Sequence, residues 1–481
     1  MCASLTTLPG AAAYGAIELP RGVLFAIAWV LTWLTSGGLV MGFGPLYSRL
    51  VDEQQWHDLC PANATSVCSA QEVQLQSVYS TGLLMTVLAQ AIFGALLDTI
   101  GPRYMTTGAY LFSIAGNVCM AYGDSHNGTD GLLVAGFALI GFGGMGILYA
   151  SLQLSELFHE PALYTSIMLA AYSISGYIYV FLALDVTRKA FFLGYAILSA
   201  LAMVIGFLVF PIHHIQTVRE RVTTSGLSLA RPNIDMPKLR RLWAGLKLQL
   251  RRRDFWFYVI LGSLVFLVLV YAGGAIPSIV TTHAKNNFVL KDRYTNYLYP
   301  LVSNTSFLFT PLGGYLIFQF GFKATCYVTI TFFALLCGSF MLPTLGSMNL
   351  AFALMAITYG LMSTIQYVYI MHCFPHELYG LLAGLATLLV FIYCLLSYAL
   401  TALVQYSFDG NSNYAFLILF CTTMLAYFTV PYLREETDYV ADPTLHFDSS
   451  PPPLNGFEHE DGDAAPDSII KSSAVEILTP R

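Results

Sequence analysis

Charged residues are scarce in this sequence. Asp, Glu, Lys and Arg make up 10% of its 481 residues, whereas hydrophobic residues make up 56%. A soluble domain carries roughly 25% charged residues, so most of this surface must face something other than water, and lipid is the simplest explanation. The overall charge of −6 also argues against nucleic acid as a partner. The composition therefore predicts an integral membrane protein.

Sequence motifs of enzymes are missing as well. The chain contains no HExxH, GxSxG or P-loop pattern. No cluster of Asp, His or Cys inside the apolar segments suggests catalysis within a membrane. An enzyme is therefore the weakest functional hypothesis, and we expect neither a metal site nor a cofactor.

Long apolar segments recur along the chain, each of about the 20 residues that cross a bilayer as a helix. We predict twelve spans: 22–46, 77–97, 104–122, 131–154, 163–184, 190–211, 255–280, 296–318, 324–343, 350–371, 380–404 and 413–433. They divide the chain into a cytoplasmic N-terminus (1–21), an N-terminal six-helix bundle (22–211), a basic cytoplasmic linker (212–254), a C-terminal six-helix bundle (255–433) and a disordered acidic cytoplasmic tail (434–481).

The positions of Lys and Arg predict the orientation. Ten of these residues lie between Arg219 and Arg253, in the linker. Because Lys and Arg concentrate in cytoplasmic loops, we expect the linker and both termini to be cytoplasmic. A plasma membrane is the favoured location, with a vacuolar or lysosomal membrane as the alternative.

The loop after the first span carries two cysteines and a glycosylation sequon. Cys60 and Cys68 flank Asn63-Ala64-Thr65, and the predicted orientation places all of them outside the cytoplasm. A disulfide and glycosylation of Asn63 are therefore expected. The alternative for the cysteines is two free thiols.

The end of the linker, 236–253, reads as an amphipathic helix. One face collects apolar residues and basic residues fill the rest; the apolar positions are Leu239, Leu242, Trp243, Leu246 and Leu250. This pattern predicts a helix lying on anionic lipids at the cytoplasmic surface. A calmodulin-type target is the alternative.

An internal repeat relates the two halves. GALLDTIGPR begins at Gly94 and GYLIFQFGFK begins at Gly314, so Gly101 matches Gly321 at the same spacing, with Phe318 in place of Asp98. Duplicated helical units place a substrate site between the halves, near the middle of the membrane.

The first of these loops carries a family resemblance. Gly94-x-x-x-Asp98-x-x-Gly101-x-Arg103 resembles the signature loop of the major facilitator superfamily. The resemblance implies an all-α membrane protein of twelve transmembrane helices in two pseudo-symmetric six-helix halves. It also implies a cytoplasmic gate in which Asp98 meets Arg103 or a helix N-terminus, with Glu156 as a further candidate partner.

Two other segments, 141–158 and 374–380, resemble solute carrier family 43. That family includes facilitators of large neutral amino acids and an equilibrative nucleobase carrier. The resemblance implies a similar cargo. The broader resemblance to facilitator-type carriers favours a monomer.

The centres of the predicted spans contain no Asp, Glu, Lys or Arg. Ionisable groups inside a membrane are costly and are kept for function, so their absence predicts a neutral or zwitterionic cargo and uncoupled transport. A proton role for His372 is the alternative.

Uncharged polar residues and glycines remain as candidates for binding the cargo. They are Ser36, Gly37, Gly38, Tyr149, Gln153, Tyr172, Ser175, Tyr271, Asn304 and Gln366. Each also has a structural interpretation, because Gly serves close helix packing, Tyr anchors at interfaces, and Gln or Asn bridges helices. The leading hypothesis is a rocker-switch facilitator of large neutral amino acids. A nucleobase carrier and a non-transporting sensor on a carrier fold are the alternatives.

Overall fold

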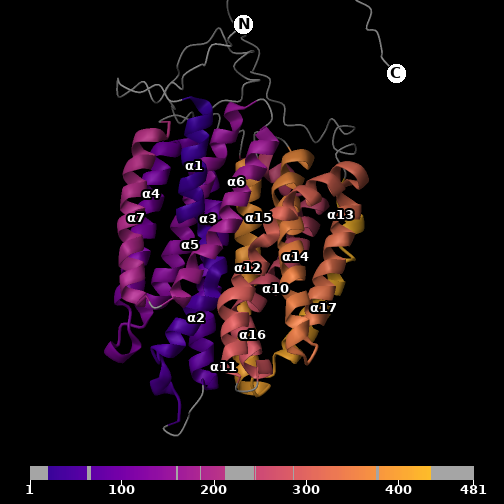
Figure 1. Cartoon of the computed structure of the whole chain (residues 1–481). Coiled ribbons are helices and arrows are strands. Elements are labelled where there is room, and N and C mark those ends of the chain that lie inside the picture. The colour runs from indigo at the N-terminus through magenta and orange to yellow at the C-terminus, as the bar shows by residue number, and fades with distance from the viewer. Residues whose placement is uncertain are drawn as a thin grey trace, which may run out of the picture.

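The computed structural model describes residues 20–61, 67–158, 161–184, 186–211, 243, 245–284, 287–374 and 379–434. Within these ranges the chain forms helices and no strands (Figure 1). Asn63, Leu239 and Leu242 lie outside the described residues, as do most of the predicted linker and the acidic tail. The side chains of Asp98, Glu156 and His372 are also outside the description.

The first half is built from six crossings, several of which end in a turn of 3-10 helix. In chain order the elements are α1 Arg21–Thr35, η2 Gly37–Gly42, α2 Phe43–Asp52, η3 His57–Leu59, α3 Ser69–Ile100, α4 Pro102–Tyr122, η4 Ser125–Asn127, α5 Gly131–Leu152, η5 Gln153–Leu157, α6 Pro161–Ser175, η6 Gly176–Ala183 and α7 Arg188–Val209.

The second half has the same number of crossings but is more broken up. Its elements are α10 Arg253–Ala284, α11 Phe288–Asp292, η7 Arg293–Leu298, α12 Tyr299–Ser303, η8 Asn304–Leu308, α13 Thr310–Phe340, α14 Leu345–Cys373, α15 Tyr379–Cys394, α16 Leu396–Ser407, α17 Ser412–Ala426 and η10 Val430–Tyr432. Of these, η7 is a π-helix and the other η elements are 3-10 helices.

Helix lengths agree with twelve crossings. Nine helical stretches of the described chain are long and apolar enough to cross a membrane. One of them, Phe288–Phe340, has 53 residues, or about 80 Å of helix, which is more than twice the thickness of a bilayer core. It therefore holds two crossings, and α4 and the shorter apolar stretch Ile167–Ala183 supply the remaining two.

The predicted repeat reappears in the backbone. Gly101 has φ 83° and ψ 159°, and Gly321, its counterpart in the second half, has φ 82° and ψ 175°. This region of φ/ψ space is essentially restricted to glycine. Each glycine joins two successive crossings at the same place in its half, so the duplication extends to local geometry.

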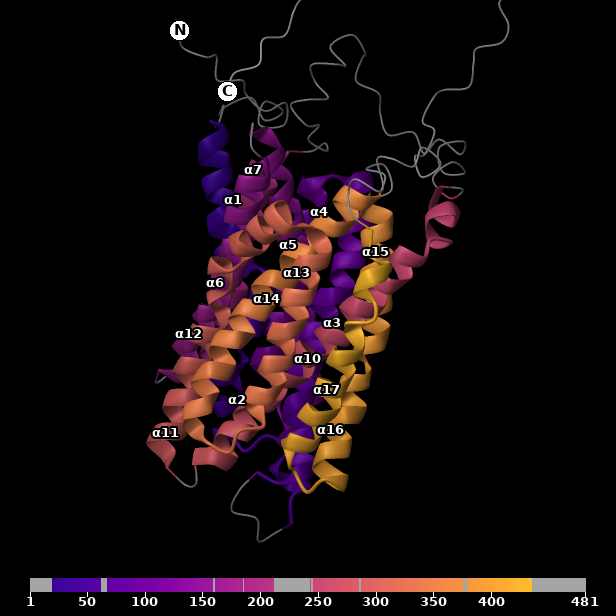
Figure 2. The same ribbon diagram turned by 90° about the vertical axis from the view of Figure 1, so that its right-hand side faces the viewer.

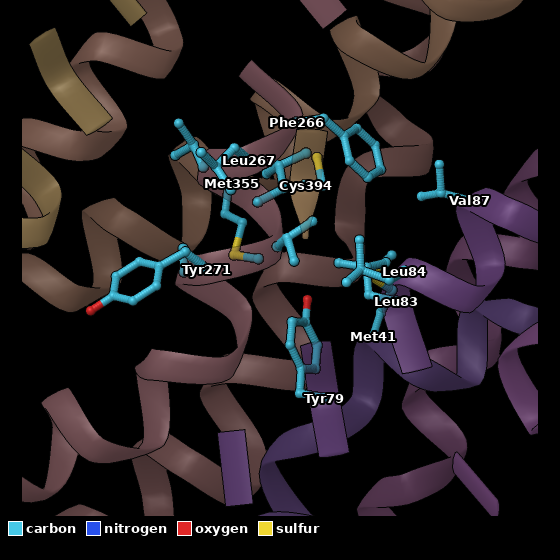
Figure 3. Packing of buried hydrophobic residues seen from close by; sticks show 14 of the residues in the cluster. Met41, Tyr79, Leu83, Leu84, Val87, Phe266, Leu267, Tyr271, Met355 and Cys394 are labelled. Carbon is cyan, nitrogen blue, oxygen red and sulfur yellow. The ribbon is translucent and has the colours of Figure 1, made fainter. Parts of the chain in front are cut away.

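The two halves pack along a shared interface. In the first half α4 packs on α5 and α7, and in the second half α13 packs on α14 and α17. Helix α3 belongs to the first half by sequence but also packs against α10, α15 and α16. Figure 2 shows α3 lying behind α10 and α17. Figure 3 shows part of the apolar cluster that joins the halves, with Leu83, Leu84 and Val87 of α3 near Phe266 of α10.

The two ends of the bundle differ. Cys60 and Cys68 are joined by a disulfide, with their Cα atoms 5.7 Å apart, and we call this end the disulfide side. The described chain begins at Pro20 and ends at Arg434, both at the other end (Figure 2), which we call the opposite side. On the disulfide side Arg188 bonds Glu53 and the carbonyls of Met120 and Gly123, which ties the loops of the first half together.

Candidate functional site

A narrow cavity lies between the two halves. Residues of α3, α5 and α6 line it from the first half, and residues of α10, α13 and α14 line it from the second. The lining consists of Gln90, Met145, Leu148, Leu169, Tyr172, Ser173, Phe266, Leu269, Thr310, Tyr359, Met362, Ser363, Gln366 and Tyr367.

Polar groups from the two halves meet across this cavity. The Gln366 amide donates to Oε1 of Gln90 over 2.8 Å, and the Tyr359 hydroxyl lies 3.4 Å from that of Tyr172. Ser173, which also lines the cavity, accepts from Ser306 at 3.2 Å. A polar solute that binds here would replace these hydrogen bonds between the halves with hydrogen bonds to itself. Binding at this site would therefore affect how the two halves are held together.

The lining residues carry no charge: among the described residues around the cavity there is no Asp, Glu, Lys, Arg or His. Six of them are Met, Leu or Phe, and the rest offer amide or hydroxyl groups. Burying an unpaired ion in such a site is costly. The site therefore suits a solute of zero net charge with both an apolar and a polar part.

Close backbone contacts shut the bundle on the disulfide side of the cavity. A Cβ atom on Gly44 of α2 would lie 2.1 Å from the carbonyl oxygen of Thr295, in the second half. A Cβ on Gly273 of α10 would lie 2.0 Å from the hydroxyl of Tyr79, in the first half. Figure 3 shows the Tyr79 hydroxyl directed into the cluster between the halves. Glycine at both positions therefore permits the closed arrangement.

Two of the ten predicted binding residues line the cavity. Tyr172 lies on α6 and Gln366 on α14, and they face it from different halves. Gln366 also borders a second hollow, between α10 and α15. The structure thus brings together the predicted contributions of spans five and ten.

Four predicted residues lie in helix contacts behind the cavity. Ser36 donates to Ser175 over 3.2 Å. A Cβ on Gly37 would lie 3.0 Å from the carbonyl oxygen of Gly141, and one on Gly38 would lie 1.9 Å from that of Tyr172. In this arrangement the broken first span packs closely on α5 and α6, and its glycine backbone faces those helices.

The other four predicted residues are placed elsewhere in the bundle. Tyr271 packs on Phe416 with ring centroids 5.5 Å apart, and its ring points away from the other labelled side chains in Figure 3. Asn304 donates to the carbonyl of Pro300 at 2.8 Å. Tyr149 is half-buried on α5. The Gln153 amide is buried and has no hydrogen-bond partner among the described residues. None of the four lines the cavity.

At the predicted gate loop, Arg103 has a definite position. It is fully buried, and its Nε donates to the carbonyl of Phe210 over 2.7 Å. Its backbone N–H donates to Pro211, so it satisfies carbonyl groups just beyond the end of α7. A Cβ atom on Gly94 would lie 3.6 Å from the ring of Tyr149. A gate role for Asp98 and Glu156 stays a prediction.

The sequence reasoning did not single out Gln90, Thr310, Ser363 or Tyr367, all of which line the cavity. For Gln90 a signal was available. Gln76, Tyr79 and Gln90 follow Glu72 by 4, 7 and 18 residues, close to one, two and five helical turns, which places these polar groups on one face of α3. A polar stripe on an otherwise apolar span indicates contact with protein and not with lipid.

The described end of the linker is partly embedded. Leu246 is buried and Leu250 packs against the core, whereas Trp243 is 58% exposed. Arg252 forms a buried ion pair with Asp254 and also bonds Gln249. Binding of anionic lipid along 236–253 stays a prediction, since most of its basic face lies outside the described residues.

Solved transporter structures share this architecture. The D-xylose–proton symporter matches with a TM-score of 0.60 at 16% identity, over 86% of this chain and 98% of that chain. The nucleoside transporter NupG matches with a TM-score of 0.58 at 13% identity, over 85% and 99%. An auto-inhibited peptide transporter of the POT family matches with a TM-score of 0.56 at 12% identity, over 89% and 99%. At these identities the matches show the fold alone.

One curated protein shares a short stretch of sequence. Protein FMP42 of Saccharomyces cerevisiae is 30% identical over 100 residues, which are 20% of this chain and 20% of that protein. The match therefore spans about a fifth of that relative.

A helical bundle in two halves with a central cavity is the architecture of many membrane transporters. The profile of the Major Facilitator Superfamily matches residues 28–398, which is most of the chain. This chain belongs to the Major Facilitator Superfamily.

Proposed function

We propose that this transporter is a facilitative, uncoupled carrier of neutral or zwitterionic small solutes, with large neutral amino acids as its main substrates. The observation that carries the proposal is the uncharged cavity between the halves, which combines amide and hydroxyl groups with an apolar wall. The resemblance of 141–158 and 374–380 to solute carrier family 43 supports the substrate class.

The cavity suits the two parts of such a molecule. Gln90, Gln366 and nearby hydroxyl groups can hydrogen-bond an ammonium and a carboxylate whose charges cancel. Met145, Leu148 and Phe266 supply the apolar surface for an aliphatic or aromatic side chain. The broken cross-half bonds would re-form after release, and rocking of the halves would expose the site alternately to the two sides.

A nucleobase carrier is the second candidate. Tyr172, Tyr359 and Tyr367 offer aromatic rings at the cavity, and the Gln90–Gln366 amide pair matches the donors and acceptors on the edge of a planar base. Competition between leucine and adenine separates the two candidates.

The test is uptake into proteoliposomes. We expect labelled leucine to equilibrate without being concentrated, whether or not a pH gradient is present. Gln366→Leu should lower transport efficiency about 5- to 150-fold, because a buried polar partner worth roughly 1–3 kcal/mol is lost. Gln405→Leu is the matched control, since Gln405 is a buried glutamine outside the cavity lining.

Three results would contradict the proposal. Gradient-driven concentration of leucine would exclude uncoupled transport. Uptake of adenine but not leucine would favour the second candidate. No uptake of either solute by folded protein would favour the non-transporting sensor.

A further inference from the structure

A buried carboxyl group lies on the disulfide side of the cavity, at the boundary between the halves. Glu72, in the first turn of α3, is 4% exposed. The second predicted span begins at residue 77, so the sequence places Glu72 outside the membrane-spanning segments. It belongs to a helical stretch, Ser69–Gly94, that is long and apolar enough to cross a membrane.

The surroundings of Glu72 come from both halves. Tyr47 of α2 lies 2.6 Å from Oε2, and the Gln76 amide donates to Oε1 over 2.7 Å. From the second half, the Ser278 hydroxyl of α10 lies beside the carboxyl group and Lys291 of α11 acts on it at longer range. Tyr271 of α10 is a further titratable group near it. The site is thus complete only when the halves are closed on this side.

Comparison with Asp254 shows what is unusual here. Asp254 is 3% exposed and forms an ion pair with Arg252. Glu72 is equally buried, yet none of the ion pairs formed by the described residues includes it. A buried carboxylate without a close counter-charge is costly, whereas a protonated carboxyl group is not. Both carboxyl oxygens accept a hydrogen bond, Oε1 from Gln76 and Oε2 from Tyr47, but neither donor carries a positive charge.

Opening of the disulfide side would separate Glu72 from Ser278 and expose it to water, where the carboxylate is the stable form at neutral pH. Closing would then take up a proton from that side. By linkage, acid on the disulfide side favours the closed arrangement and base favours opening.

The site communicates with one compartment only. Tyr79 lies seven residues further along α3, about 10 Å away, and its contact with Gly273 separates Glu72 from the cavity. A proton bound at Glu72 therefore returns to the side from which it came, and no net proton transport follows.

We infer that Glu72 is a proton-binding site that closes the disulfide side of the carrier and makes its transport respond to the pH of that compartment alone. The inference rests on the alternating access in the proposed function, but not on the identity of the substrate.

Hydrogen exchange followed by mass spectrometry on the full chain in nanodiscs tests the closure without any substrate. Wild type and Glu72→Gln are compared at pH 5.5 and at pH 8, since the amide mimics the neutral acid. At pH 8, peptides covering 43–52, 271–284 and 293–303 should exchange several-fold faster in wild type than in Glu72→Gln. At pH 5.5 the same peptides should exchange equally fast in the two proteins. Asp52→Asn, an exposed carboxylate of the same side, should behave as wild type. Equal exchange of wild type and Glu72→Gln at both pH values would overturn the inference.

Two further measurements keep the test decisive. Tyr47→Phe removes a hydrogen bond to Glu72 that is stronger when Glu72 is a carboxylate than when it is the neutral acid. The midpoint of the pH response should therefore rise by about 0.5–1 unit. An unchanged midpoint contradicts the inference even if Glu72→Gln does not fold. In proteoliposomes, pH on the disulfide side should change uptake several-fold and pH on the other side should not. An equal response to both sides overturns regulation from one side. Absence of leucine uptake would contradict only the proposed function, because the hydrogen-exchange experiment on Glu72 uses no substrate.

Discussion

Gly273→Ala is expected to open the disulfide side of the transporter. The added methyl group would lie 2.0 Å from the hydroxyl oxygen of Tyr79 and 2.2 Å from its Cζ. Both distances are far below ordinary van der Waals contact, and Tyr79 is fully buried, so the ring cannot move into open space. The Gly273 carbonyl also accepts a hydrogen bond from Tyr299, which holds the backbone of α10 in place.

The expected cost of this overlap is about 1–3 kcal/mol, the usual penalty for overpacking a core. Because the contact joins the two halves, the penalty falls on the closed arrangement and not on either half alone. The population of the closed arrangement relative to the open one should therefore fall about 5- to 150-fold.

Hydrogen exchange of the peptides that cover 43–52 and 271–284 measures the shift. Exchange should become faster in Gly273→Ala, with little change in the melting temperature of the whole protein. Gly338→Ala is the matched control, because a Cβ on that helical glycine meets nothing within 4 Å. Tyr79→Leu, which removes the ring, should restore slow exchange in the double variant. Unchanged exchange in Gly273→Ala would refute the reasoning.

Three further predictions concern other parts of the bundle. Gly101→Ala and Gly321→Ala should each lower the melting temperature, since the positive φ angles at these positions cost an L-residue roughly 1–3 kcal/mol. Gly108→Ala is the control, because a Cβ atom there meets open space. Melting temperatures equal to that of the control would contradict the predicted backbone strain. The double substitution Cys60→Ser with Cys68→Ser should lower the free energy of unfolding by about 2–3 kcal/mol, because the loop that the disulfide closes is short. Mass spectrometry should find Cys60 and Cys68 unalkylated in the native protein unless the disulfide is first reduced. Asp98→Asn should slow turnover while preserving substrate binding, and unchanged turnover would exclude the gate role.

The architecture was accessible from the sequence because its causes are local. Apolar length predicts each crossing, and the 220-residue spacing of Gly101 and Gly321 predicts the duplication, which the matching φ angles confirm. The start of α3 was placed at 77 instead of 69. Gln71, Glu72 and Gln76 give that turn the composition of a loop, and only contacts with other helices keep these residues buried.

The site was harder to predict because it depends on which helix faces which. Gln366 and Tyr172 were selected as polar residues on spans near the axis, and both line the cavity. Gly37 and Gly38 were selected by the same reasoning but contact α5 and α6. Periodicity along one helix does not show which neighbour its glycines approach, since that depends on the rotation of each helix within the bundle.

The position of α3 also has a consequence for how the chain is made. Its polar face is completed by residues synthesised much later: Gln366 follows Gln90 by 276 positions, and Ser278 follows Glu72 by about 200. Until α10 and α14 have entered the membrane, these amide and carboxyl groups have no partner from the second half and face lipid or temporary contacts. Biogenesis of this carrier therefore includes an interval in which the first half is inserted but incomplete, and its quality control must tolerate that interval.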